Sequence, residues 1–159
     1  MQRRALLALA GATIASACTS QGGLPALESS FAYAGASPRD ALDAVNRARA
    51  RNGRAPMRID GKAQRAAARH ARSMARAAKM AHILPGEPGF TKRLARDGIR
   101  TLAAENVAWG QRDVAGAMTA WMNSSGHRRN ILDKRFNGVG VASAPAADGR
   151  LYWAMILVP

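Results

Sequence analysis

The stretch WMNSSGHRRNIL, residues 121–132, says more about the fold of this chain than any other. Just before it, Asp113 is placed to cap a helix. Apolar residues then recur at core spacing: Val114, Ala117, Met118, Trp121 and Met122. The helix is expected to end in a polar turn at residues 123–126. His127, one of three histidines in the chain, follows that turn directly.

Upstream, the sequence predicts helices and one extended segment. Ser37 and Pro38 are typical of a helix start, and this helix is expected to stop near residues 52–53. Residues 57–59 alternate as in a short strand. Asp60 then caps a helix of about five turns that His82 closes, just before a segment rich in proline and glycine. A short helix is expected at residues 91–96.

The helix that follows Asp60 has two different faces. Its basic residues make one stripe, expected to face solvent or an anionic surface: Lys62, Arg65, Arg69, Arg72, Arg76 and Lys79. The opposite stripe is made of alanine and methionine and is expected to pack inward: Ala63, Ala67, Met74, Ala77 and Ala81. His70 lies on this second stripe, which favours a hydrogen-bonded histidine in the core or supporting a site.

The C-terminal part changes to a period of two. Val139 and Val141 alternate with small residues, and Asp148 and Gly149 are typical of a hairpin turn. Residues 151–158 are almost all apolar, as in a strand that is buried on both faces. Helices early in the chain and a hairpin late indicate the α+β class.

The N-terminus has the pattern of an export signal. Arg3 and Arg4 precede an apolar run at residues 5–17, which has the length of the apolar h-region of a signal peptide and is too short to span a bilayer. Residues 1–18 are therefore expected to be a signal peptide. The paired arginines also fit twin-arginine export.

Cys18, the only cysteine, stands where the signal would be processed. Residues 14–18 resemble a bacterial lipobox, with Ala15 in the place where leucine is usual. Lipidation of Cys18 would anchor the protein in the cell envelope, on the periplasmic side. Cleavage at the small residues 15–17, with release of a secreted protein, is the alternative. Residues 19–36 are small and polar and are expected to be a flexible tether for a domain at residues 37–159.

The chain is strongly basic, with a formal net charge of +14. This charge favours anionic partners such as a phospholipid membrane, lipopolysaccharide or a cell-wall polymer. Nucleic acid is disfavoured because the protein is expected to be exported. A compositional bias without any partner remains open.

Glu105 and Asn106 stand in a mostly apolar stretch, where a carboxylate is unusual. With them, the chain resembles the CAP superfamily, whose SCP domain occurs in cysteine-rich secretory proteins, antigen 5, pathogenesis-related class 1 proteins and many exported bacterial proteins. Six elements carry the resemblance in the family's order, over a span from Ser37 to Pro159: residues 67–74 with His70, then His82, residues 105–110, residues 121–132, residues 138–140, and Tyr152-Trp153.

The resemblance implies a three-layer α-β-α sandwich with a central antiparallel sheet. It also implies a cleft where His82, Glu105 and His127 converge, with Asn106 and His70 beside them. Two imidazoles and a carboxylate are suited to a divalent, zinc-type metal, and a carboxylate bonded to an imidazole also suits a general base. Fuller family sites carry a second glutamate near the tryptophan. Here residues 123–125 are Asn-Ser-Ser, which weakens both interpretations.

Structural alternatives stay open for these residues. Glu105 and Asn106 would then brace the fold through buried hydrogen bonds, and His127 with Arg128 would cap the C-terminus of a helix. The three tryptophans, Trp109, Trp121 and Trp153, are expected in the core.

Two functions follow. The first is a non-enzymatic, membrane-tethered domain that binds a small ligand, a lipid or another envelope component, since the sequence has no nucleophile triad. The alternative is a hydrolase acting on a peptide or cell-wall substrate through His82, Glu105 and His127, with or without a metal. A third, structural hypothesis is an envelope protein that docks on anionic surfaces through its arginine stripe. The oligomeric state and the ligand are not specified by the sequence.

Overall fold

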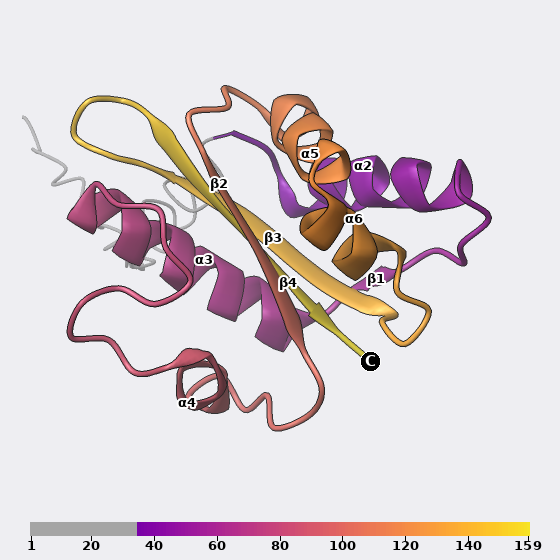
Figure 1. Cartoon of the computed structure of the whole chain (residues 1–159), viewed down its shortest axis with the longest axis horizontal. Coiled ribbons are helices and arrows are strands. Elements are labelled where there is room, and N and C mark those ends of the chain that lie inside the picture. The colour runs from indigo at the N-terminus through magenta and orange to yellow at the C-terminus, as the bar shows by residue number, and fades with distance from the viewer. Residues whose placement is uncertain (1–34) are drawn as a thin grey trace, which may run out of the picture.

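The computed structural model describes residues 35–159, so the expected signal peptide, Cys18 and nearly all of the tether lie outside the described residues. Four strands form the centre of the fold, and helices cover both faces of the sheet (Figure 1). The elements in chain order are α2 (Pro38–Ala50), β1 (Arg58–Ile59), α3 (Gly61–Ala77), α4 (Phe90–Ala95), β2 (Ala104–Trp109), α5 (Val114–Asn123), α6 (Ser125–Leu132), β3 (Gly138–Pro145) and β4 (Leu151–Val158).

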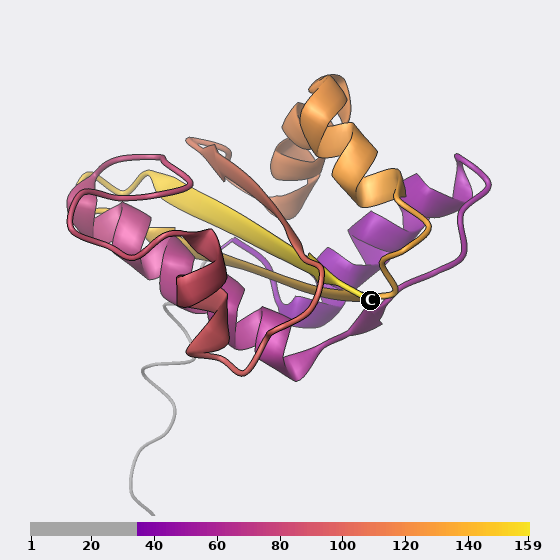
Figure 2. The same cartoon turned by 60° about the horizontal axis from the view of Figure 1, so that its bottom comes forward.

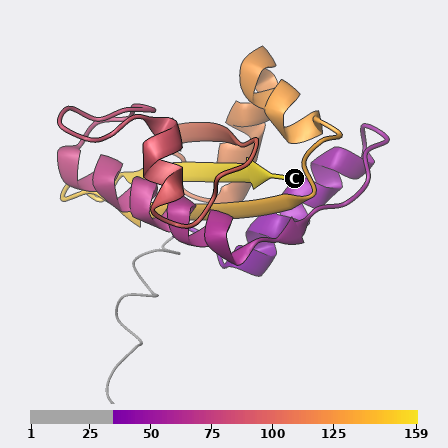
Figure 3. The ribbon, with the colours of Figure 1, turned by 90° about the horizontal axis from the view of Figure 1, so that it is seen from below.

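The strand order is β1-β3-β4-β2. The β3–β4 and β4–β2 pairs are antiparallel, and the two-residue β1 joins β3 in parallel. One apolar core lies between this sheet and α3 with α4, and a second lies between the opposite face and α2, α5 and α6. Figures 2 and 3 show these layers from two further directions. The predicted α+β class and α-β-α sandwich are confirmed.

Helix starts follow the predicted caps. Ser37 and Asp40 form a capping box on α2, and the carboxylates of Asp60 and Asp113 accept main-chain N–H groups at the starts of α3 and α5. The predicted hairpin turn is also present, since Gly149 has a φ of +79° between β3 and β4. Among residues 35–159, no helix is long and apolar enough to cross a bilayer.

The α3 helix lies unusually close to β3. A Cβ atom at Gly140 would stand 2.2 Å from the main chain of Ala63 and Gln64, so only glycine fits there. The Gln64 amide makes two hydrogen bonds with the main chain of Val141, at 2.8 and 3.1 Å, as a neighbouring strand would. The contact therefore sets the position of α3, and with it His70, against the sheet.

Two expected helix ends are wrong. The α3 helix ends at Ala77 rather than at His82, because Ala78 takes a left-handed conformation (φ 47°). The N–H groups of Ala78 and Lys79 then bond to the carbonyls of Ala75 and Met74, which is a Schellman closure. Beyond it the chain is a loop, so His82 is a loop residue.

The expected polar turn at residues 123–126 shrinks to a single non-helical residue. Ser124 is extended, and α6 begins at the next residue. His127 therefore lies in the first turn of α6, and the alternative that it caps a helix C-terminus is wrong. The C-terminal end of α6 is bound by Arg49 of α2. Arg49 is 2 % exposed and donates to the carbonyls of Ile131 and Asp133.

Candidate functional site

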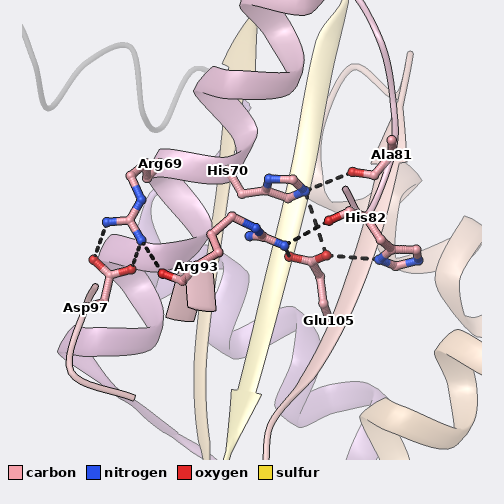
Figure 4. A network of polar contacts seen from close by, with 7 residues as sticks. All are labelled: Arg69, His70, Ala81, His82, Arg93, Asp97 and Glu105. Atoms are coloured by element: carbon pink, nitrogen blue, oxygen red, sulfur yellow. Dashed lines mark hydrogen bonds and ion pairs between the residues drawn. The ribbon is translucent and has the colours of Figure 1, made fainter. Parts of the chain in front are cut away.

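A buried carboxylate at one edge of the sheet gathers three basic side chains (Figure 4). Glu105, on the edge strand β2, has a side chain that is 3 % exposed. Its Oε1 accepts a hydrogen bond from His82 Nδ1 over 2.9 Å, and its Oε2 accepts one from Arg93 Nη2 over 2.8 Å. His70 Nε2 lies 3.7 Å from Oε1. We call these four residues, His70, His82, Arg93 and Glu105, the Glu105 cluster.

Two of these side chains also hold the loop that carries His82. His70 Nε2 donates to the carbonyl of Ala81 over 2.9 Å, and Arg93 Nη2 donates to the carbonyl of His82 over 3.1 Å. Both anchors come from regular structure, α3 and α4. The loop after α3 is thus held to the Glu105 cluster by hydrogen bonds, and the His82 ring lies with its Nδ1 on Glu105. The His82 side chain is 56 % exposed, so its other nitrogen is left to solvent.

Asn106 points to the opposite face of the sheet. Successive side chains of a strand alternate between faces, and β2 pairs Glu105 with Ile156 of one core and Asn106 with Met155 of the other. Asn106 is fully buried and donates to the carbonyl of His127 over 3.1 Å. Its Oδ1 accepts from Asn130 over 2.9 Å. Asn106 therefore positions α6 on β2 and does not join the Glu105 cluster.

His127 is half-buried at the start of α6, and its ring makes no hydrogen bond to any described side chain. It is near enough to His82 for the two imidazoles to interact electrostatically. Of the three residues expected to converge, His82 and Glu105 are hydrogen-bonded. His127 makes no hydrogen bond or ion pair with the Glu105 carboxylate in the described part of the chain.

The three histidines have different protonation behaviour. The hydrogen bond to Glu105 raises the pKa of His82 above its usual 6.5. Burial lowers the pKa of His70, so His70 is neutral at neutral pH and its contact with Glu105 is not an ion pair. Burial, and then the nearby His82, lower the pKa of His127. Near neutral pH the exposed ring of His82 is thus the histidine best able to carry a positive charge.

The residues present do not fit the expected metal site. Between residues 35 and 159, no three side chains of histidine, cysteine, aspartate or glutamate are grouped so that they could hold a metal ion. One carboxylate oxygen of Glu105 is bonded to the guanidinium of Arg93, a fixed positive charge that opposes a divalent cation at the same carboxylate.

Three further residues differ from expectation. Trp109 is 43 % exposed at the end of β2, where it stacks on Tyr152, so its expected core position is wrong. Arg69 was expected to face outward, yet it is half-buried and forms a bidentate ion pair with Asp97. Arg93 was not anticipated as a site residue at all. Locally it looks like its exposed neighbours Lys92 and Arg96, and no signal in the sequence separates it from them.

A mixed sandwich with a histidine–glutamate pair at the edge of its sheet is the architecture of a CAP, or SCP, domain. A model of the cysteine-rich secretory protein family (CAP) matches residues 42–157, and the chain belongs to that family. It is similar to the uncharacterized protein YkwD of Bacillus subtilis, with 32 % identity over 102 residues, which are 63 % of this chain and 39 % of YkwD. The chain therefore spans about two fifths of the length of that relative.

Solved structures agree on the fold. An extracellular protein of Bacillus anthracis that contains an SCP domain matches 76 % of this chain and 39 % of its own, with 27 % identity and a TM-score of 0.67. An outer surface protein of Borrelia burgdorferi matches 75 % of this chain and 89 % of its own, with 16 % identity and a TM-score of 0.67. A cysteine-rich secretory protein of Staphylococcus aureus has 20 % identity, a TM-score of 0.60, and coverage of 76 % and 37 %. At 16 % and 20 % identity, the likeness concerns the fold alone.

Proposed function

We propose that this protein is an extracytoplasmic CAP domain that binds a small anionic component of the cell envelope, with His82 as the binding group. One observation carries the proposal: a buried carboxylate holds the Nδ1 of an imidazole whose side chain is 56 % exposed. A ring held in this way loses little rotational freedom when it binds a ligand.

The electrostatics of the Glu105 cluster favour an anion over a cation. Glu105 raises the pKa of His82, and Arg93 adds a buried positive charge on the other side of the same carboxylate. Around neutral pH His82 can therefore donate a charged hydrogen bond to a carboxylate or phosphate. The net charge of the full chain is +14 and is still +12 without Arg3 and Arg4 of the expected signal peptide, and this charge brings such ligands near the surface.

The extracytoplasmic location rests on the export pattern at residues 1–18 and on one similarity. The Bacillus anthracis relative, with 27 % identity, is described as extracellular. Lipidation of Cys18 would retain the domain at the membrane. Mass spectrometry of protein taken from its native envelope tests this, since an unmodified or absent Cys18 would contradict the lipid anchor.

A titration of the histidine ring signals by NMR tests the binding group. Phospholipid head groups, peptidoglycan fragments and anionic glycans are added in turn to the protein, and the expected result is a saturable shift of the His82 ring. His82→Ala should abolish that binding, while Lys79→Ala, an exposed cation in the same loop, should leave it within about twofold. Equal affinity of the His82→Ala variant and the wild type for every ligand would overturn the proposal.

Hydrolysis is the second candidate, and one observation favours it. His82 and His127 are neighbours whose pKa values are shifted in opposite directions, as in acid–base pairs of enzymes. Against it, no serine or threonine hydroxyl of the described residues is hydrogen-bonded to the ring of His82 or His127, so these residues supply no activated hydroxyl nucleophile. Equal activity of the wild type and a His127→Ala, Glu105→Gln variant on peptide and cell-wall substrates would eliminate this candidate.

A further inference from the structure

Behind the Glu105 cluster, between α3 and α4, lies a small cavity of about 200 Å³. We call it the α3–α4 cavity. Four arginines line it, namely Arg69, Arg76, Arg93 and Arg96, together with His70 and Glu87. His82 and His127 are not among its lining residues, so it is separate from the exposed face of the candidate site.

Arg93, one of the residues that line the α3–α4 cavity, has buried donors without partners. Arg93 uses only Nη2 in hydrogen bonds, and its Nε and Nη1 are buried with no partner among residues 35–159. Its side chain is 4 % exposed. Buried donors of a charged group are costly to leave unpaired, which points to a ligand that accepts hydrogen bonds from them.

Two other residues that line the α3–α4 cavity, Glu87 and His70, supply buried acceptors. Glu87 Oε2 is buried without a partner in the described part of the chain. His70 donates through Nε2 to the Ala81 carbonyl, and its neutral ring then offers only a lone pair at Nδ1, which is also buried and unpaired. A ligand that satisfies the α3–α4 cavity must therefore accept from Arg93 and also donate to Glu87 or His70.

We propose that the α3–α4 cavity is a binding site for the free hydrogen phosphate ion. Its oxygens would accept from Arg93, and its remaining P–OH would donate to Glu87. Sulfate has the same shape and no proton to donate, so Glu87 would repel it. A phosphomonoester has a second pKa of about 6 and has lost its P–OH proton at pH 7.5, so it would behave like sulfate. A volume of about 200 Å³ is also smaller than the roughly 300–1,000 Å³ of pockets for drug-sized ligands.

Calorimetry and ³¹P NMR on the purified full-length chain at pH 7.5 test this with inorganic phosphate, sulfate and glycerol 3-phosphate at matched ionic strength. Phosphate is expected to bind saturably, about tenfold or more tighter than the other two, because only it pairs with Glu87. Absence of saturable phosphate binding, or equal affinity for sulfate, would overturn the proposal. Equal affinity for glycerol 3-phosphate would overturn its assignment to the free ion.

Two variants and one control make the test specific. Glu87→Gln keeps the size of the side chain and should reduce the preference for phosphate over sulfate to less than about threefold. Arg96→Gln should weaken both anions about threefold, since this arginine is exposed. Arg65→Gln removes an exposed cation of α3 outside the α3–α4 cavity and should change neither affinity. An unchanged preference for phosphate over sulfate in Glu87→Gln contradicts the proposed role of Glu87. Should that variant fail to fold, the ratio of the wild-type affinities for phosphate and sulfate still tests the proposal.

His82→Ala separates this site from the proposed function. It should remove binding of envelope ligands and leave phosphate affinity unchanged, because His82 does not line the α3–α4 cavity. Loss of phosphate binding in this variant would contradict two separate sites.

Discussion

The side-chain amide of Asn106 donates a hydrogen bond to the main-chain carbonyl of His127 over 3.1 Å. Through this bond the third residue of β2 holds the first turn of α6, and the side chain of Asn130 donates a second bond to the same amide over 2.9 Å. Two segments that look independent in the sequence, residues 105–110 and 121–132, are thus joined by one buried amide. We expect Asn106→Ala to lower the free energy of unfolding by about 1–3 kcal/mol, because Asn130 and the His127 carbonyl lose their buried partner.

Urea unfolding measures this effect. Asn123→Ala is the matched control, since Asn123 is exposed at the end of α5 and should change the free energy of unfolding by less than about 0.5 kcal/mol. Similar effects of the two substitutions would contradict the role assigned to Asn106.

Gly140→Ala should be among the most destabilising single substitutions in the chain. The added Cβ would stand 2.2 Å from the α3 main chain, so helix and sheet would have to separate. Overpacking of this kind costs about 1–3 kcal/mol, and main-chain overlap places it at or above the upper end. Gly126→Ala is the control: a Cβ there meets nothing within 4 Å, and alanine is the better helix former, by up to about 1 kcal/mol. Thermal unfolding of both variants should therefore shift in opposite directions, and a tolerated Gly140→Ala would refute the close contact.

The His82–Glu105 bond should be visible in the pH dependence of stability. Because the folded state raises the pKa of His82, this pair stabilises the fold fully below the usual pKa of 6.5, and its contribution is lost as the pH rises through the raised value. NMR titration should place the pKa of His82 above 6.5 in the wild type. In Glu105→Gln it should fall to the usual 6.5 or below, since the neutral amide removes the hydrogen-bonded charge and burial remains. An unshifted His82 in the wild type would contradict the bond.

His70 should act in the opposite sense. Burial lowers its pKa, so the unfolded chain binds the proton more readily and stability decreases as the pH falls below 6.5. His70→Gln keeps a donor for the Ala81 carbonyl and cannot be protonated. Its unfolding free energy, measured in urea between pH 7 and pH 5, should decrease less steeply than that of the wild type. His127 contributes in the same direction as His70, so the slope should be reduced and not abolished. An unchanged slope would show that His70 is not buried in its neutral form.

Arg49 should stabilise the fold through the several N–H donors of its planar guanidinium and not only through its charge. It donates to the carbonyls of Ala55, Ile131 and Asp133, and a lysine ammonium cannot reach all of them in that geometry. Arg49→Lys is expected to cost about 2 kcal/mol in the free energy of unfolding. Arg47→Lys, on the exposed side of the same helix, should cost almost nothing, and equal losses in the two variants would contradict this account.

Much of the fold was predictable because its signals are local. Capping residues such as Ser37, Asp60 and Asp113 each act within one turn of a helix. The alternation at Val139 and Val141 marks β3, and the continuous apolar run at residues 151–158 marks β4, which is buried on both faces. The end of α3 was not predictable in this way, because Ala78 takes a conformation in which glycine is usual. The loop that follows Ala78 is bonded to residues distant in the sequence, Arg93 and Glu105, which no local signal reveals.

The candidate site was predictable in part for the same reason. Glu105 stands out because a carboxylate in an apolar strand needs partners, and His82 is one of them. Arg93 does not stand out, since only the packing of α4 against α3 distinguishes it from other arginines. Glu105 and Asn106 lie on opposite faces of the sheet because successive side chains of a strand alternate. The prediction of one shared cleft for both residues did not take this alternation into account.

The adjacency of Glu105 and Asn106 also bears on how this chain avoids misfolding. If β2 paired with β4 one residue out of register, Glu105 would enter the core beside Met155, without Arg93, and Asn106 would lose α6. Both errors arise from the same slip, and each buries an unpartnered polar group. The two neighbouring residues therefore disfavour the same wrong register, and the register that brings Glu105 to Arg93 also places Asn106 where it can bond α6.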